Sequence, residues 1–151
     1  IAMPQIGPGK AARFESHARD DGRLRVTGAL GDAYAFRTPS LRNVTLTAPY
    51  GHAGAYADLE DAVRHHLDPV TELDTYAVTS ARLPELPGAA DLRIQSDVDQ
   101  RAAIAEANTL APRTLSDADV TAILAFLKTL EDPAERLGVP ESVPSGLPVD
   151  K

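Results

Sequence analysis

The pattern of apolar and polar positions predicts few regular elements, and the clearest is a helix over residues 116–131. Ser116 and Asp119 have the spacing of a capping box at the start of a helix. Proline at 133 ends the pattern, because the residue before a proline avoids the helical region. The apolar residues of this segment recur at helical spacing and form one stripe: Val120, Ile123, Leu124, Leu127 and Leu130.

A second helix is predicted over residues 58–67, with Asp58 as its N-cap and Pro69 beyond its end. Four of its residues share one face at helical spacing: Leu59, Ala62, Val63 and His66. His65 is turned by about 100° from His66 and is expected at the margin of this face. A polar ring on an apolar face costs roughly 1–3 kcal/mol without a partner, so His66 is either hydrogen-bonded to a carbonyl or a metal ligand.

The remaining segments show weaker patterns. Residues 98–108 have helix-forming composition, whereas residues 1–38 carry the glycines and prolines of turns and should lie on the rest of the molecule. Residues 69–97 show no period and are expected to form a long irregular loop at a partner surface. Residues 133–151 are rich in proline and are expected to dock as an extended tail. The predicted fold is mainly α with long irregular loops, and a large apolar cofactor would help to organise such short helices.

Composition limits the classes of function. The 151 residues suit one domain, and no run of 18 apolar residues predicts a membrane span. A net charge of −7 and 5% aromatic residues argue against nucleic acid as a partner. The chain has no cysteine, which excludes disulfides, thiolate metal sites and a C-x-x-C-H haem attachment motif within it.

The four histidines are therefore the main candidates for chemistry. His17 lies in a polar stretch and reads as a solvated loop residue, while His52 sits between glycines that allow close approach to another group. A zinc site of His52, His65 and His66 is disfavoured, because neighbouring histidines on a helix point apart. The G-x-S-x-G motif of serine hydrolases is absent.

Three ordered motifs resemble the C-terminal haem domain of bacterial di-haem cytochrome c peroxidases. They are residues 36–44 (FRTPSLRNV), 46–54 (LTAPYGHAG) and 58–63 (DLEDAV). Similarity to this domain extends over nearly the whole chain, residues 1–151, and implies a cytochrome-c-like fold. It implies a periplasmic enzyme that reduces hydrogen peroxide to water with electrons from a small redox protein, a cytochrome c or a cupredoxin.

The resemblance also implies parts that are not in this sequence. A peroxidatic haem would lie in an N-terminal domain, and the C-x-x-C-H motif that attaches haem c would stand shortly before Ile1, which is not a usual start residue. We therefore expect the isolated chain to be inactive, and the resemblance is compatible with a homodimer. An electron-transfer or cofactor-maturation protein that oxidises a protein partner, and a haem-free scaffold, remain alternatives.

In the family, an axial ligand of the electron-transfer haem lies fourteen residues after the histidine of the P-Y-x-H-x-G motif. That position holds Met or Tyr in known members and His66 here, and an imidazole in place of a thioether should lower the haem potential. The resemblance further implies that Arg42 pairs with a haem propionate and that His52 and Tyr50 lie near the haem. It assigns the backbone carbonyls to a calcium ion at two positions, Thr47 and Pro49.

Overall fold

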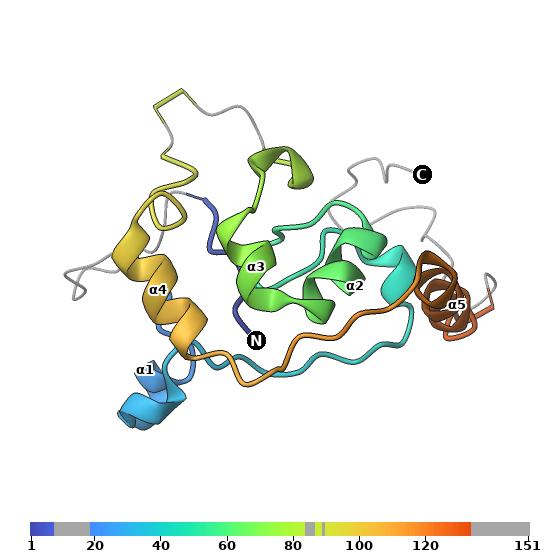
Figure 1. Ribbon diagram of the computed structural model, residues 1–151, viewed down its shortest axis with the longest axis horizontal. Coiled ribbons are helices and arrows are strands. Elements are labelled where there is room, and N and C mark those ends of the chain that lie inside the picture. The colour runs from blue at the N-terminus through green and yellow to red at the C-terminus, as the bar shows by residue number, and fades with distance from the viewer. Residues whose placement is uncertain (8–18, 84–86, 89, 134–151) are drawn as a thin grey trace, which may run out of the picture.

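Helices form nearly all the regular structure of the protein, as a computed structural model shows for residues 1–7, 19–83, 87–88 and 90–133 (Figure 1). Five are α-helices: α1 (Leu24–Thr27), α2 (Leu59–Leu67), α3 (Pro69–Asp74), α4 (Val98–Glu106) and α5 (Asp117–Lys128). Three are short 3-10 turns: η1 (Leu30–Asp32), η2 (Val44–Leu46) and η3 (Val78–Ser80). The mainly α fold with irregular connections that the sequence predicts is confirmed.

The three predicted helices correspond to α2, α4 and α5. The capping box at Ser116 is present, since its side chain accepts from the backbone of Asp119 while the Asp119 carboxylate accepts from the backbone of Ser116. Asp58 is the N-cap of α2 but makes no side-chain capping bond there. The predicted tail falls almost entirely on residues 134–151, which lie outside the described part of the chain.

The prediction that residues 69–97 are irregular throughout is wrong, because α3 follows α2 directly and η3 follows α3. Pro69 ends α2 and also begins α3, since a proline at the first helical position lacks only an N–H that would have no partner in the helix. The Asp68 side chain caps the new helix by accepting a hydrogen bond from the backbone N–H of Thr71, at 3.4 Å.

The described core consists of two small clusters. One joins the chain start to α3 and α4 through Ala2, Leu73, Ile94 and Ile104. The other packs α2 against the loop before it and contains Ala55, Tyr56 and Ala62. The expectation that the first residues lie on the rest of the molecule is confirmed for residues 1–7, of which Ala2, Pro4 and Gln5 are buried.

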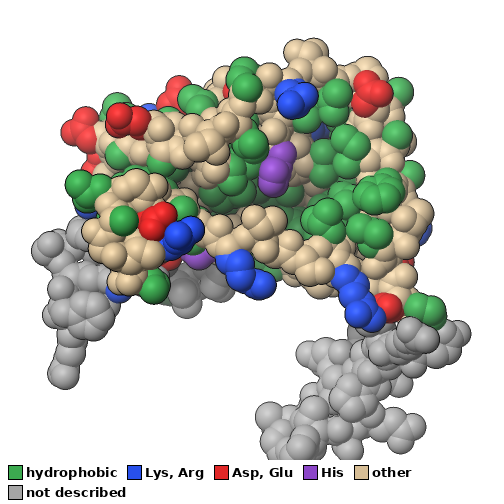
Figure 2. All heavy atoms as spheres, turned by 90° about the horizontal axis from the view of Figure 1, so that it is seen from below, with side chains coloured by type: hydrophobic (Ala, Val, Ile, Leu, Met, Phe, Trp, Pro, Cys, Tyr) green, Lys and Arg blue, Asp and Glu red, His purple; other side chains and the backbone are tan. Residues whose placement is uncertain are grey.

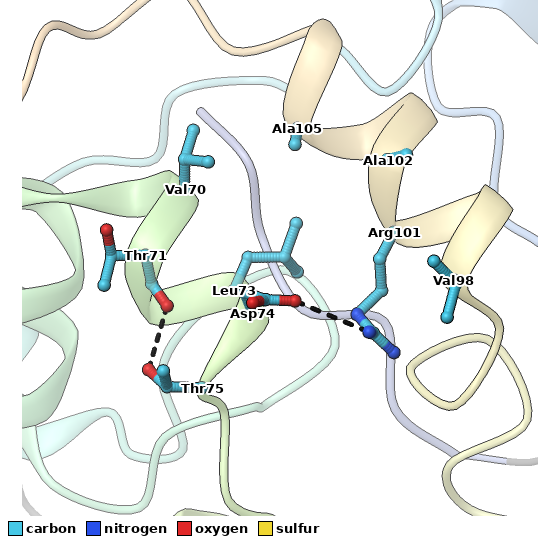
Figure 3. A pocket seen from close by; sticks show the side chains of 9 residues that line it. All are labelled: Val70, Thr71, Leu73, Asp74, Thr75, Val98, Arg101, Ala102 and Ala105. Carbon is cyan, nitrogen blue, oxygen red and sulfur yellow. Dashed lines mark hydrogen bonds and ion pairs between the residues drawn. The ribbon is translucent and has the colours of Figure 1, made fainter.

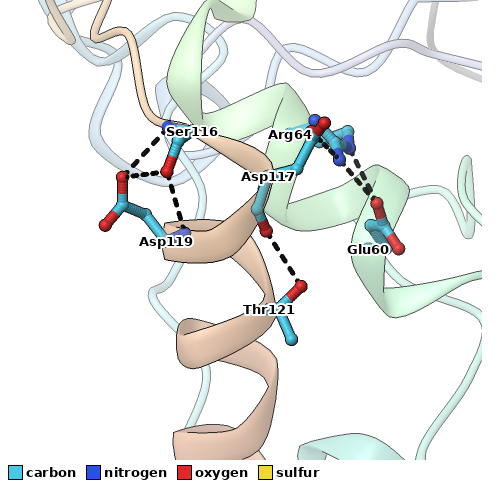
Figure 4. A network of polar contacts seen from close by, with 6 residues as sticks. All are labelled: Glu60, Arg64, Ser116, Asp117, Asp119 and Thr121. Carbon is cyan, nitrogen blue, oxygen red and sulfur yellow. Dashed lines mark hydrogen bonds and ion pairs between the residues drawn. The ribbon is translucent and has the colours of Figure 1, made fainter.

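A polar network fastens α2 to the start of α5 (Figure 4). The guanidinium of Arg64 donates to Glu60 one turn earlier, at 2.7 Å, and to Asp117 of α5, at 2.8 Å. Close to this network the backbone N–H of Arg113 donates to the carbonyl of Leu67 at 2.7 Å. The segment that leads into α5 therefore runs alongside α2.

None of the helices in the described ranges has the length and apolarity that crossing a bilayer requires.

Candidate functional site

The two neighbouring histidines of α2 have opposite environments. Their rings are nearly perpendicular, with centroids 6.1 Å apart. His65 has no exposed surface, whereas His66 is exposed. The expectation that His65 lies at the margin is therefore wrong, because the side of α2 that carries His65 and Ala62 packs against the preceding loop. The predicted apolar face is only partly covered, since Leu59 and Val63 are half-buried and His66 is exposed, whereas Ala62 is buried. The open face of α2 therefore consists of Leu59, Val63 and His66.

One nitrogen of His66 is held by its own helix. Nδ1 lies 2.7 Å from the backbone carbonyl oxygen of Ala62. A carbonyl can only accept, so Nδ1 carries the proton and donates it. In the neutral ring the lone pair then lies on Nε2, the nitrogen commonly offered to a metal when the other one is held by a carbonyl. His66 is thus an exposed imidazole in the tautomer of a metal ligand.

His65 is buried against Tyr56. Its Nδ1 is 2.8 Å from the hydroxyl oxygen of Tyr56, which is 3% exposed. Its Nε2 has no hydrogen-bond partner among the described residues. Burial and, to a smaller extent, the neighbouring His66 lower the pKa of His65 to about 4 against an opposing effect of the Ala2 backbone, so the ring is neutral at pH 7. Burial likewise raises the pKa of Tyr56, and raises that of Tyr76 to about 12.

Exposed apolar side chains occur on the elements next to α2 and on the segment before α5. α5 packs against both α2 and η2. Four large apolar residues of these elements and of the segment before α5 are exposed by 37–58%: Leu46, Leu110, Leu115 and Phe126. Seen from below, hydrophobic side chains gather around a hollow in which a histidine side chain lies (Figure 2). An exposed nitrogen lone pair beside apolar surface suits a large flat apolar group that contains a metal ion.

His52 is placed by the loop that precedes α2. Two backbone hydrogen bonds between Tyr50 and Tyr56, of 2.7 and 3.1 Å, close this loop. Nε2 of His52 is 3.0 Å from a carboxylate oxygen of Asp20, and its ring stacks on Phe36 with centroids 3.6 Å apart. Within the described ranges no three His, Asp or Glu side chains are grouped so that they could hold a metal ion.

Arg42 is engaged by a carboxylate at the far end of α5. Its guanidinium donates two hydrogen bonds to Asp132, at 2.7 and 2.9 Å, and the side chain of Asn43 donates to the same carboxylate at 2.9 Å. These hydrogen bonds hold the pKa of Asp132 below its ordinary value. Sequence reasoning missed Asp132, since nothing along the chain pairs it with a residue ninety positions earlier.

Thr47 and Pro49 are exposed, beside the cis peptide bond between Ala48 and Pro49. The hydroxyl of Thr47 donates to the carbonyl of Val44 at 3.1 Å. The backbone carbonyls of Thr47 and Pro49 accept no hydrogen bond from the described residues.

A separate cleft of about 320 Å³ lies between α3 and α4 (Figure 3). Arg101 and Asp74 form an ion pair across it, at 3.4 Å. The other lining residues are mostly small or apolar: Val70, Thr71, Leu73, Thr75, Val98, Ala102 and Ala105. None of the predicted site residues lines this cleft, and it was not predicted because it depends on α3.

Comparisons with known proteins found short local similarities. The chain is 54% identical over 44 residues to the cytochrome c551 peroxidase of Pseudomonas aeruginosa, and this match covers 29% of the chain. It is 52% identical over 50 residues to the cytochrome c551 peroxidase of Nitrosomonas europaea, covering 33% of the chain. The methylamine utilization protein MauG of Paracoccus denitrificans is 33% identical over 100 residues, covering 64% of the chain.

The matched parts amount to 13%, 15% and 23% of the lengths of these three relatives, so the chain spans less than a quarter of each. Neither a family model nor a solved structure matches the chain. The local similarities nevertheless support a relationship to bacterial di-haem cytochrome c peroxidase-like proteins.

Proposed function

We propose that this chain forms the distal side of the electron-transfer haem of a di-haem, peroxidase-type redox protein, with His66 as an axial ligand of the iron. The observation that supports this most is the hydrogen bond from Nδ1 of His66 to the carbonyl of Ala62, at 2.7 Å. It leaves Nε2 free at an exposed position on an open apolar face. The same residue occupies the ligand position that the family motif implies.

The residues present fit one side of a haem. His66 offers a neutral imidazole, the Ala62 carbonyl keeps it in the required tautomer, and Leu59 and Val63 lie on the same helix face and would exclude water from the ring. Cysteines for covalent attachment are not part of this sequence, so they and the ligand on the opposite side would come from elsewhere in the protein. Such a haem supplies a one-electron carrier.

The full reaction in this proposal is the reduction of hydrogen peroxide to water. Electrons would come from a small redox protein, a cytochrome c or a cupredoxin, and the reaction itself would take place at a peroxidatic haem in an N-terminal domain. The enzyme would work in the periplasm. The names of three relatives, two cytochrome c551 peroxidases and the cytochrome c peroxidase Ccp of Escherichia coli, support this assignment.

The neighbouring residues have supporting roles in the proposal. Arg42 would pair with a propionate, for which it would have to share or exchange its bond to Asp132. His52 and Tyr50 would lie near the haem edge. The free carbonyls of Thr47 and Pro49 would contribute to a calcium site, which needs further oxygen ligands beyond these two.

A second candidate is a protein that uses the same haem arrangement to oxidise a protein partner. The observation that favours it is that the match to MauG, a methylamine utilization protein that is not named a peroxidase, covers 64% of the chain, against 29–33% for the peroxidases. Peroxide consumption by the full-length, haem-loaded protein with a reduced electron donor separates the two. Turnover with a small donor supports the peroxidase, and its absence supports the second candidate.

The ligand assignment is tested in the full-length, haem-loaded protein with His66→Ala. We expect this haem to lose its low-spin electron paramagnetic resonance signal, because the iron loses a strong nitrogen ligand. Added imidazole should restore the signal by filling the space left by the side chain. An unchanged low-spin signal in His66→Ala would show that another residue is the ligand.

A further inference from the structure

We infer that the buried hydrogen bond between Tyr56 and His65 is a positioning device for His66, which sets the direction in which its free Nε2 points. Tyr56 and His65 are positioning residues and do not themselves contact a ligand. The role in haem binding rests on the proposed function, whereas the effect on the ring of His66 does not.

Contacts outside α2 hold Tyr56 in place. Its backbone forms two hydrogen bonds with Tyr50 across the loop. Its ring contacts that of Tyr76 edge to face, with centroids 5.7 Å apart. The hydroxyl of Tyr76 donates to the carbonyl of Ala55 at 2.6 Å, a bond that involves neither the Tyr56 hydroxyl nor α2, and Tyr76→Phe would keep the ring contact with Tyr56. The Tyr56 hydroxyl therefore presents a fixed point to α2.

Tyr56 bonds one residue of α2 and shares a buried cluster with another, and these two residues determine the placement of His66. Its hydroxyl forms a hydrogen bond with Nδ1 of His65, which directly precedes His66 in the sequence, at 2.8 Å. Its ring belongs to the same buried cluster as Ala62, whose carbonyl holds Nδ1 of His66. A rotation of α2 about its axis that breaks the first contact would also move the second. The orientation of the His66 ring thus depends on the position of Tyr56.

The pair has little value for stability alone. A neutral buried hydrogen bond has a small net contribution, and the unpartnered Nε2 of His65 offsets it. An apolar side chain at position 65 would fill the core without leaving a polar atom unpaired. The hydrogen bond adds a directional constraint on α2. It selects one rotation of the helix about its axis among those that apolar packing alone would allow.

The other contacts that hold α2 restrict its rotation about its axis less. The Arg64–Asp117 contact lies at the surface, where Asp117 is 90% exposed and both side chains can follow a small rotation. The bond from Arg113 to the Leu67 carbonyl holds the end of the helix, one residue after His66. Neither contact reaches the side of the helix that carries His65.

The test compares Tyr56→Phe with Tyr76→Phe. Each change removes one buried hydroxyl from the same aromatic cluster, but only the first removes a bond to α2. In the full-length, haem-loaded protein, we expect the Nδ1–H of His66 to exchange with solvent about tenfold faster in Tyr56→Phe, as measured by NMR. Tyr76→Phe should leave this exchange within twofold of the parent protein. Equal exchange rates in both variants would overturn the inference.

A second measurement uses the full-length, haem-loaded protein. We expect Tyr56→Phe to bind added imidazole at this haem about tenfold more tightly than Tyr76→Phe does, because His66 competes less well for the iron. If the exchange result holds but neither variant changes imidazole binding, His66 is positioned as inferred but is not the ligand, and the proposed function fails alone. If His66→Ala shows that His66 is the ligand while exchange is equal in both variants, only the positioning role fails.

Discussion

At the scale of single residues, the chemistry of α2 depends on which nitrogen of each histidine is free. His66 has its Nδ1 bonded to Ala62 and its Nε2 available, whereas His65 has its Nδ1 bonded to Tyr56 and its Nε2 buried without a partner. Both rings belong to one turn of helix, and only the exposed one can reach a ligand. The buried one is a structural element with an energetic cost.

This cost can be measured in the protein by comparing single and double variants. Tyr56→Phe leaves Nδ1 of His65 buried and unpaired, so we expect a loss of about 1–3 kcal/mol in the free energy of unfolding. The double variant Tyr56→Phe with His65→Leu removes both polar partners. Its free energy of unfolding should fall by less than that of Tyr56→Phe alone. Urea unfolding followed by circular dichroism gives both values. A double variant less stable than the single one would contradict this explanation.

At the scale of elements, α5 is joined to the rest of the chain at both ends. Its start meets α2 through Asp117 and Arg64, and its end meets the loop before η2 through Asp132 and Arg42. Between these ends Val120 and Leu127 are buried. The helix therefore fixes the position of α2 relative to the loop that contains Arg42. The open face of α2 depends on this arrangement.

The start of α5 offers a direct test of its capping box. Ser116→Ala removes the side-chain acceptor for the backbone N–H of Asp119, and we expect a loss of about 1 kcal/mol in the free energy of unfolding. Ser116→Thr keeps the hydroxyl and should restore most of this loss. Thermal unfolding of the three proteins checks the order. Equal destabilisation by alanine and threonine would show that the hydroxyl does not cap the helix.

The end of α5 gives a pH-dependent prediction. The bonds from Arg42 and Asn43 lower the pKa of Asp132 below its ordinary value of 3.8. The contact therefore contributes to stability above about pH 4, and the contribution is lost as the pH falls through the lowered pKa. Arg42→Gln should move the pKa of Asp132 back toward its ordinary value, as a carboxyl NMR titration can show. An unchanged pKa would mean that Arg42 does not hold this carboxylate in solution.

Sequence reasoning predicted α2, α4 and α5 because their signals are local: a periodic apolar face, capping residues or helix-forming composition, and a terminating proline. It missed α3 because Pro69 was interpreted only as the end of one helix, although proline suits the first position of the next. It predicted the helix that carries both histidines but placed His65 wrongly, because burial depends on the loop that packs on α2. The pairing of Arg42 with Asp132 is a tertiary contact that no pattern along the chain reveals.

At the scale of the whole molecule, the described part has a small core and a large exposed apolar surface. Seven of the nine buried apolar residues in the described ranges form two clusters, one of four residues and one of three, and Val120 and Leu127 of α5 are buried outside them, while ten large apolar side chains are exposed. Where such side chains form a contiguous patch, the patch commonly marks an interface or a ligand site. A haem on the open face of α2 would cover part of it.

Leu115 tests whether the apolar side chains beside α2 control access of water to the haem. It lies between Arg113 and Asp117, which both contact α2. In the haem-loaded protein we expect Leu115→Ser to lower the reduction potential of this haem, because water near the iron favours its more positive oxidised state. Val26→Ser is the matched control, since Val26 is 87% exposed on α1 and should leave the potential unchanged. If the haem has the same reduction potential in Leu115→Ser as in Val26→Ser, Leu115 does not lie near the haem.

The central claim is that His66 is an axial ligand of a haem iron, and the reduction potential of His66→Met in the full-length, haem-loaded protein tests it most directly. A thioether in place of the imidazole should raise the potential of one haem by on the order of 100 mV, within the ~0.8 V range that axial ligands span. The other haem should keep its potential. If both haems of His66→Met keep the potentials of the parent protein, His66 does not bind iron and the account is contradicted.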